Sequence, residues 1–415
     1  MTPRWSAGNR IELLENGDEF YPRVFREIER ARHEVIIETF ILGEDRVGEA
    51  LTQVLVEAVG RGVRVELTVD AWGSRGLSEE FLHALTTGGV CVHLFEEKRP
   101  RWLLRVAWFR RLHRKIVTID GRLAFVGGIN FSEDHLSDYG REAKQDYSVS
   151  IAGPVAREIR CFARAAIEPA HRHDGAPDVN LGALGPRGAE AGSMRVMFMV
   201  RDNRRGHRTT IEKHYRAAIR QARRRLIIAN AYFFPGHLLL REIRAAARRG
   251  VDVTLIMQAE PDIRIARFGA RLLYDYLLQG GVKIYEYRDR QFHGKVALID
   301  DDWVTVGSSN LDPLSLWFNL EANVVVRDDR FNSAVHRRLQ ALVDGSCREI
   351  RRADQPRRVF WRPIAAFFAF HLLRRFPRLT GLLPAHQPQL TKLAASGRGV
   401  VRKRAARERS ELARR

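Results

Sequence analysis

The sequence contains few cysteines. There are three in 415 residues, Cys91, Cys161 and Cys347, and their spacing is not that of metal ligands. A small odd number argues against a disulfide framework and against a cysteine-bound zinc, and it is typical of a reducing compartment. We expect all three to be small buried side chains.

Long apolar runs are absent as well. No stretch approaches the roughly 20 uninterrupted apolar residues of a membrane-spanning helix, and polar and acidic residues appear near the amino terminus before any run long enough for a signal peptide. These absences predict a cytoplasmic protein that is either soluble or peripheral to a membrane.

Basic residues exceed acidic ones, and nearly all of them are arginines. The formal net charge is +20, and only eight of the 70 basic residues are lysines. Such a charge attracts nucleic acid or anionic lipid without choosing between them. Because lysine is scarce, a lysine inside a motif is more informative here than usual. An apolar content of 45% is enough for a large core or for two domains of about 200 residues.

One pattern occurs twice in the chain. Each copy has the form H-x-K-x-x-x-x-D and is followed, at the same interval, by a glycine-led turn that ends in asparagine. A repeat of both the motif and its trailing turn is not credible as an accident. The residues are His113, Lys115, Asp120 and Asn130 in the first copy, and His293, Lys295, Asp300 and Asn310 in the second.

Similar elements precede both copies. Buried strands are predicted at 34–38 and 225–229, and each is followed by a helix that ends at an Arg-Gly pair and by another that ends at two glycines. Strands that alternate with helices predict an α/β fold with a parallel or mixed sheet covered on both faces. The domains we expect are a first repeat over 1–170, a linker over 171–193, a second repeat over 194–350 and a carboxyl-terminal segment over 351–415.

The motif itself favours phosphate chemistry. Residues 115–119 read as a strand that enters a tight turn, and alternation along a strand puts His113 and Lys115 on one face. An imidazole beside an ammonium group suits a phosphate, and the asparagine can return to the same place. Displacement at a phosphodiester needs a nucleophile and an acid, but one repeat has only one such histidine. Two repeats that face each other across a pseudo-twofold axis supply both.

These residues resemble the paired HKD motifs of the phospholipase D superfamily, and the resemblance covers essentially the whole chain except the tail. It implies two phospholipase-D-like repeats that pack as a pseudo-twofold dimer with one active site between them. In that family one histidine attacks phosphorus to form a phosphohistidine, and the other acts as acid and then as base. Carried over, His113 is the nucleophile and His293 the acid and base, although the near symmetry leaves the reverse assignment open.

The resemblance also assigns the neighbouring polar residues. Both lysines and both asparagines of the motifs, Lys115, Lys295, Asn130 and Asn310, would bind the phosphoryl oxygens, so neither a metal nor another cofactor is expected. Asp146 and Glu321 occupy matching places after their motifs and are expected to orient the histidines. The motif aspartates Asp120 and Asp300 count among the catalytic motif residues, yet their position at strand ends favours a turn and packing role.

One departure from the superfamily pattern narrows the resemblance. The first copy has Gly128 where serine is common, and bacterial cardiolipin synthases look the same there. The run from Gly127 to Asp146 is similar to the subgroup called cardiolipin synthase B. This resemblance implies the transfer of a phosphatidyl group between phospholipids, with phosphatidylglycerol as donor, acceptor or both.

Two segments predict contact with lipid. Residues 101–111 and 359–376 mix tryptophan, phenylalanine and leucine with arginine, as interfacial helices do, and the basic tail from 398 adds attraction to anionic lipid. We expect a peripheral protein on the cytoplasmic side of the inner membrane. Its expected partners are an anionic phospholipid membrane and phospholipid substrates.

Three alternatives stay open at this point. A phospholipase D hydrolase would use the same residues with water as the acceptor. A nuclease or other nucleic-acid phosphodiesterase fits the charge, but the aromatic residues cluster with leucine in apolar stripes and so disfavour a base-stacking groove. The third alternative is a noncatalytic membrane-binding scaffold. The sequence leaves the oligomeric state open.

Overall fold

The computed structural model describes residues 3–95, 110–171, 191–202, 209–259, 273–352 and 390–393. Within these ranges no helix combines the length and apolar character needed to cross a membrane. The predicted linker and the predicted lipid-contacting segments 101–111 and 359–376 lie wholly or mostly outside the described residues, as does the tail from 398.

The first half folds as the apolar pattern predicts. Strand β2 (Glu34–Thr39) is buried at every position, as expected of a strand covered on both faces. Side chains cap the helices that follow it: Asp45 accepts from backbone N–H groups at the start of α2, and Ser78 does so at the start of α3. The remaining elements are β1 (Ser6–Glu15), α1 (Asn16–Glu29), α2 (Arg46–Gly60), β3 (Arg64–Asp70), α3 (Glu79–Thr87), β4 (Cys91–Phe95), β5 (Ile116–Ile119), β6 (Leu123–Gly127), η2 (Glu133–His135), η3 (Ser137–Glu142), β7 (Lys144–Gln145), β8 (Tyr147–Ala152) and α4 (Pro154–His171).

The second half repeats this succession. The predicted strand at 225–229 is β10 (Arg225–Asn230), and the helix predicted after it is α6 (His237–Arg248), which ends at the Arg-Gly pair. The other elements are β9 (Met194–Arg201), α5 (Thr210–Gln221), β11 (Asp252–Gln258), β12 (Lys283–Tyr287), β13 (Gln291–Phe292), β14 (Lys295–Ile299), β15 (Trp303–Gly307), α8 (Pro313–Trp317), β16 (Glu321–Arg327), α9 (Asp329–Ser346), β17 (Cys347–Ile350) and β18 (Leu390–Lys392).

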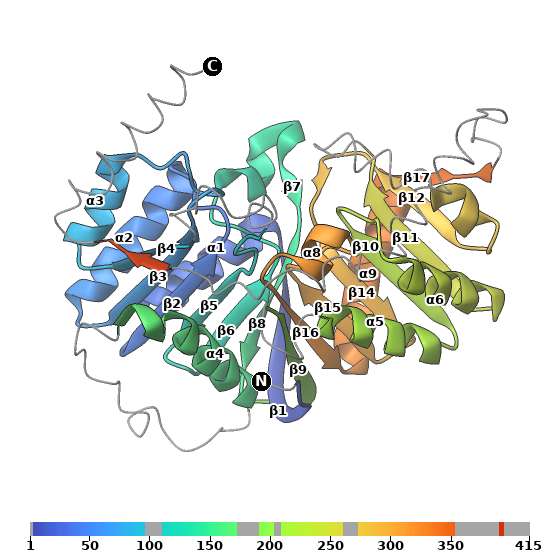
Figure 1. Ribbon diagram of the computed structural model, residues 1–415, viewed down its shortest axis with the longest axis horizontal. Helices are drawn as coiled ribbons and strands as arrows, with labels where there is room; N and C mark the ends of the chain where they lie inside the picture. The colour runs from blue at the N-terminus through green and yellow to red at the C-terminus, as the bar shows by residue number, and fades with distance from the viewer. Residues whose placement is uncertain are drawn as a thin grey trace, which may run out of the picture.

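Both halves contribute to one 16-stranded mixed sheet. The first strands of the two halves, β1 and β9, pair antiparallel at its centre. Outward from there the order is β8, β6, β5, β2, β3, β4 in the first half and β16, β15, β14, β10, β11, β12 in the second, so the two halves are arranged alike on either side of the centre. Figure 1 shows the blue-to-green first half beside the yellow-to-orange second half. The α/β fold with two similar halves is confirmed.

The outermost strand of each half comes from the carboxyl-terminal part of the chain. β17 pairs antiparallel with β12, and β18 pairs antiparallel with β4. β18 lies within 351–415, for which the sequence suggested only a lipid-contacting segment and a tail. Leu393, next to it, is buried in the core of the first half. Part of that segment therefore completes the sheet of the first half.

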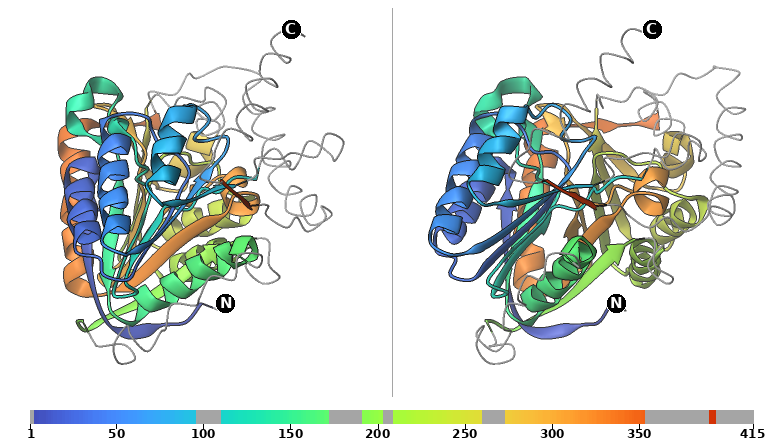
Figure 2. Two further views of the ribbon diagram at one scale, coloured as in Figure 1. Left: turned by 90° about the vertical axis from the view of Figure 1, so that its left-hand side faces the viewer. Right: turned by 60° about the vertical axis from the view of Figure 1, so that its left-hand side comes forward.

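Helices cover both faces of the sheet. In the first half α1, α2 and α3 lie on one face and α4 on the other, as the turned views show (Figure 2). Helix α4 also packs on β9, and α9 packs on β1, so the last helix of each half reaches the first strand of the other. A third apolar cluster spans the junction and joins both halves. The halves are thus connected through sheet, helices and core.

The cysteine prediction was wrong. Cys161 is exposed on α4, and Cys91 and Cys347 are only partly buried. The reason is position: Cys161 falls on the outer side of an amphipathic helix, and the other two begin strands near the ends of the sheet.

Candidate active site

Short parallel strand pairings bring each motif histidine to the opposite half. The backbone N–H of His293 donates to the carbonyl oxygen of Gln145 at 2.8 Å, and that of His113 donates to the carbonyl oxygen of Leu320 at 3.0 Å. β13 runs parallel to β7 on one side, and Leu112 forms a parallel bridge with Leu320 on the other. Each histidine therefore lies beside the residue that immediately precedes a carboxylate of the other half.

The side chains cross between the halves in the same way. His113 Nδ1 is 3.1 Å from Glu321 Oε2, and His293 Nδ1 is 2.6 Å from Asp146 Oδ2. Both carboxylates are fully buried. A carboxylate on Nδ1 holds the ring proton there, so Nε2 is the nitrogen left for a substrate. Both carboxylates were predicted as histidine partners, but the sequence did not indicate that each serves the histidine of the other half.

Burial and positive charge act on both imidazoles. Burial lowers the pKa of His113 below its usual value, against the attraction of Glu321. Burial also lowers the pKa of His293, and here nearby Lys295 and Lys144 act in the same direction. Burial by itself would raise the pKa of Glu321, but the attraction of His113 and Lys115 outweighs burial, so the pKa is lowered. Without a bound anion these effects favour neutral imidazoles, and the negative charge of a bound phosphate would favour the protonated form of one of them.

The motif lysines lie at the same place in both halves. Lys115 Nζ donates to the carbonyl oxygen of His113 at 2.8 Å, and Lys295 Nζ donates to that of His293. Burial lowers the pKa of Lys115 to about 7 and that of Lys295 to about 8. An anion bound between them would stabilise their charged forms, as a phosphate site requires.

Both motif asparagines are buried in the turns after the hairpins. Asn130 Oδ1 accepts from the backbone N–H of Ile41 at 3.2 Å, whereas Asn310 Oδ1 has no partner within the described ranges. The oxygen of Asn130 therefore holds the loop, which leaves its amide nitrogen as the group with which it could bind a phosphoryl oxygen.

The motif aspartates lie at the far end of their strands from the histidines. Asp120 accepts from the backbone N–H groups of Arg32, His33 and Glu34, and Asp300 accepts from those of residues 223–225. Both adopt positive φ, 52° and 50°, in the turns that end β5 and β14. They connect each hairpin to the adjacent strand of the sheet, which favours the turn and packing role over a catalytic one.

The two carboxylates are supported differently. Ser308 Oγ donates to Glu321 Oε2, the oxygen that also faces His113. The first half has Gly128 at this place, where a Cβ atom would lie 2.3 Å from Asp146 Oδ1. A serine would displace the Asp146 carboxylate, so the departure from the superfamily pattern has a steric reason.

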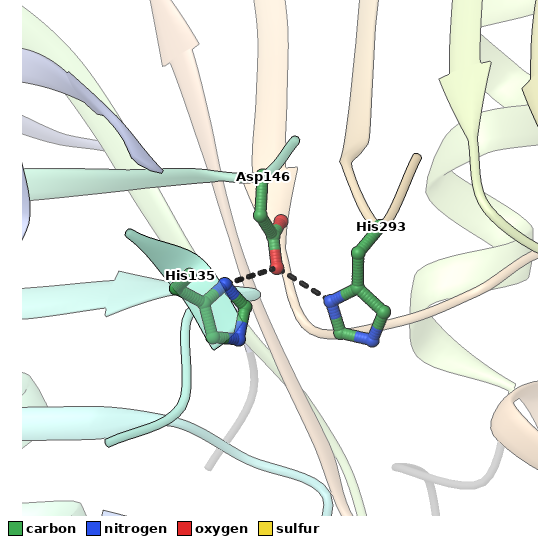
Figure 3. Close-up of side chains that lie close together, drawn as sticks. All are labelled: His135, Asp146 and His293. Atoms are coloured by element: carbon green, nitrogen blue, oxygen red, sulfur yellow. Dashed lines mark hydrogen bonds and ion pairs between the residues drawn. The ribbon is translucent and has the colours of Figure 1, made fainter. Parts of the chain in front are cut away.

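A third histidine, which the sequence analysis missed, lies beside Asp146. His135 is fully buried, and its Nδ1 is 4.0 Å from Asp146 Oδ2. Figure 3 shows its ring and that of His293 on either side of this carboxylate. Nothing in the sequence indicated His135, which lies in a short 3-10 turn after Asn130. The equivalent position after Asn310 in the second repeat is Ser315, so a comparison of the repeats does not mark this histidine.

These three side chains also have the spacing of a metal site. Donor atoms of His135, Asp146 and His293 all lie within 4.8 Å of one another. Their surroundings are cationic, however, because Lys144 and Lys295 both act on the two imidazoles. The atom types suit a transition metal, but the surrounding charge disfavours a cation.

Aromatic side chains flank the first histidine. The Phe40 ring is centred 5.2 Å from that of His113, and Lys115 Nζ is 5.3 Å from the Phe40 centroid. Trp72 lies beyond Phe40 at 6.4 Å and is 47% exposed. Arg111 lies over the indole of Trp72 at 4.9 Å. An apolar surface bordered by guanidinium groups therefore leads from the solvent to His113.

Two similar α/β halves that bring paired H-x-K motifs together at their junction define a fold of the phospholipase D class. A solved phosphatidylserine synthase from Haemophilus influenzae superimposes with a TM-score of 0.62 over 89% of this chain and 93% of its own, at 15% identity, which supports the fold alone.

Sequence comparison gives the family. The family model described as "Cardiolipin synthase, PLD-like domain" matches residues 24–158 and 215–343. Cardiolipin synthase B of Salmonella typhi is 50% identical over 397 residues, which is 94% of both chains. Cardiolipin synthase B of Escherichia coli (strain K12) is 48% identical over 401 residues, 95% of this chain and 94% of the relative. The chain belongs to the cardiolipin synthase family of phospholipase-D-like proteins.

Proposed function

We propose that the protein is a cardiolipin synthase, a phosphatidyltransferase that moves a phosphatidyl group from one phospholipid to a hydroxyl of another. The observation that carries this proposal is the crossed pair of contacts, His113 with Glu321 and His293 with Asp146, beside two buried lysines. Two imidazoles with Nε2 available provide a nucleophile and an acid. The relatives at about half identity over nearly the whole chain are cardiolipin synthases.

In the first step His113 Nε2 attacks phosphorus of a phosphatidylglycerol. The bond from phosphorus to the headgroup oxygen breaks, and protonated His293 gives its Nε2 proton to that oxygen, so glycerol leaves. Glu321 stabilises the cationic phosphohistidine through Nδ1, and Asp146 has stabilised the imidazolium of His293. Lys115 and Lys295 offset the charge that develops on the phosphoryl oxygens.

In the second step the roles reverse. Neutral His293 Nε2 accepts the proton of a hydroxyl on a second phosphatidylglycerol, and that oxygen attacks phosphorus. The bond from phosphorus to nitrogen breaks, its electron pair returns to His113, and cardiolipin leaves. His293 ends the cycle protonated, as it began. In the same proposal Asn130 and Asn310 bind the phosphoryl oxygens.

A lipid substrate requires contact with a membrane surface. The exposed Trp72, with Arg75 and Arg111 over its ring, has the composition of an interfacial site beside the reacting histidine. We place the protein peripherally on the cytoplasmic side of the inner membrane, in contact with anionic phospholipid. In the proposed division, repeats cover 1–170 and 194–350, joined by a linker at 171–193, and residues 351–415 combine the strand β18 with lipid-contacting segments.

A hydrolase is the second candidate. It would form the same phosphohistidine and differ only in the acceptor, because His293 would activate water in place of a lipid hydroxyl. The rings of Phe40 and Trp72 favour a lipid acceptor, since apolar rings beside His113 suit the interfacial part of a lipid.

Purified protein incubated with phosphatidylglycerol vesicles tests the proposal, with lipid products followed by mass spectrometry. The synthase predicts cardiolipin and free glycerol in equal amounts, and no product from His113→Ala. Phosphatidic acid without cardiolipin would establish the hydrolase instead. Turnover of DNA but not of lipid would contradict both.

A further inference from the structure

The oxygen of each carboxylate that holds a catalytic histidine faces a second donor. On Glu321 Oε2 that donor is the Ser308 hydroxyl, and the same hydroxyl accepts from the backbone N–H of Ala322 at 3.0 Å, which fixes its direction. On Asp146 Oδ2 no serine is possible, because Gly128 stands at the matching place and leaves no room for a Cβ atom. The group that faces this oxygen is His135 Nδ1.

The tautomer of His135 follows from its other nitrogen. The backbone N–H of Asn130 donates to His135 Nε2 at 3.3 Å, so Nε2 carries a lone pair and the proton of the neutral ring is on Nδ1. Burial and the charge of Lys144 lower the pKa of His135 well below its usual value, and this outweighs the attraction of Asp146. Asp134, 3.8 Å from Nε2, is the other acid nearby. The ring is therefore a neutral donor, and its Nδ1 faces Asp146 (Figure 3).

We propose that His135 is a positioning residue that does for Asp146 what Ser308 does for Glu321. It donates from Nδ1 to Asp146 Oδ2 when a substrate or another anion is bound, and so fixes the carboxylate that orients His293. The 4.0 Å separation is longer than a hydrogen bond, and bonds of this kind often shorten when a substrate is bound. This inference concerns the site of the proposed function and rests on it.

The two halves differ at two positions near their carboxylates, and the role proposed for His135 accounts for both differences. The first half has a glycine beside its carboxylate and a histidine in the following turn, whereas the second half has Ser308 and Ser315 at those places. Asp146 is also one methylene shorter than Glu321, and its other oxygen, Oδ1, accepts from the backbone N–H of Tyr147 at 2.8 Å, so His135 faces the oxygen that His293 also contacts. The backbone N–H of Asn130, which donates to His135 Nε2, links the motif turn to the same histidine.

Two substitutions of His135 with side chains of similar size distinguish hydrogen-bond donation to Asp146 from packing. Both His135→Asn and His135→Leu lose the Nε2 acceptor, but only asparagine keeps an N–H donor at the position of Nδ1. We expect His135→Asn to retain kcat within a few-fold and His135→Leu to lose at least about 10-fold more than His135→Asn, with KM for phosphatidylglycerol unchanged in both. Equal kcat for the two variants would overturn the proposal, because packing alone would then account for His135.

A measurement without substrate keeps this test separate from the proposed function. In ¹⁵N-labelled protein saturated with sulfate, which occupies a phosphate site without reacting, loss of the donor leaves more negative charge on Asp146 for His293. His135→Leu should therefore raise the pKa of His293, whereas His135→Asn should leave it unchanged, and the pKa of His113 should be the same in both variants. The wild-type ring of His135 should carry its proton on Nδ1. A proton on Nε2, or a His293 pKa that is equal in both variants, would refute the role of His135 even if no lipid were turned over.

Discussion

The two halves place the same imidazole and ammonium groups at their junction but support them with different residues. In the second half a long carboxylate, Glu321, lies beside a serine, and in the first half a short one, Asp146, lies beside a glycine and a buried histidine. The backbone contacts that align the histidines are nearly identical, 2.8 and 3.0 Å. The repeat has thus kept its register and its reacting groups, while the side chains behind the carboxylates have diverged.

The histidines themselves give the largest expected effect. His113→Ala and His293→Ala should each reduce lipid transfer by roughly 10⁴-fold or more, because each removes a participant in both steps. A diester with a p-nitrophenolate leaving group needs no acid, so His293→Ala should still form a phosphohistidine with it, seen by mass spectrometry of the intact protein. His113→Ala should form none. An adduct on His293 in the His113→Ala variant would reverse the assignment.

The carboxylates come next. Asp146→Asn and Glu321→Gln keep size but lose charge, and each should reduce kcat by about 10²- to 10⁴-fold, since the histidine it orients loses its tautomer and its support as a cation. Because the pairs cross, Glu321→Gln should impair adduct formation on His113 even with the p-nitrophenyl substrate. Asp146→Asn should leave that reaction nearly unchanged. Burst kinetics of p-nitrophenol release distinguish the two, and equal loss in both would argue against the crossed assignment.

The two motif lysines should lose their charge at different pH values. Their ammonium forms attract an anion, so the affinity for sulfate, which does not titrate in this range, should fall as the pH rises through about 7 and then about 8. Lys115→Arg stays charged, so the fall near 7 should disappear, whereas Lys295→Arg should remove the fall near 8 and keep the one near 7. The rate follows the histidines instead: kcat/KM needs a neutral His113 and a protonated His293, and both pKa values are lowered, so its optimum should lie below the usual histidine pKa. Identical profiles for both variants would contradict the difference between the halves.

Ser308→Ala should have a smaller effect. Loss of one hydrogen bond to a charged group costs about 1.5 to 3 kcal/mol, which corresponds to roughly 10- to 100-fold in kcat if the whole of it is felt in the transition state. The matched control is Ser309→Ala, because the Ser309 hydroxyl contacts only the carbonyl oxygen of Asn310 in the part of the chain that is described. Similar activity in the two variants would mean that Glu321 does not depend on Ser308.

The motif aspartates should affect stability but leave chemistry unchanged. Asparagine tolerates a positive φ, so Asp120→Asn and Asp300→Asn keep the backbone conformation and remove only the negative charge. In each half that charge accepts hydrogen bonds from three backbone N–H groups. We expect a loss of about 1 to 3 kcal/mol in the free energy of unfolding, measured with urea, and the larger loss at Asp120, which is more buried. The kcat of folded protein should stay unchanged, and a fall beyond 10-fold would return these residues to the catalytic set.

The sequence predicted the elements that carry regular patterns. Buried strands, helices ending at glycine and the hairpin after each motif all follow from local periodicity, and the repeated histidine, lysine and carboxylate follow from duplication. The crossed pairing was not predictable, because it depends on the register of two short parallel pairings between distant segments, such as 144–145 with 291–292. His135 was missed for the opposite reason: it occurs in one half only, so a search for repeats passes over it.

The strand β18 has a consequence for how the molecule is made. Residues 6–171 emerge from the ribosome first, yet β4 obtains its outer neighbour only when residues 390–392 have been synthesised. Until then residues 93–95 of β4 lack the backbone partners that β18 supplies, and an unpaired strand edge can pair with another chain. The half of the molecule that is translated first is therefore the last to be completed.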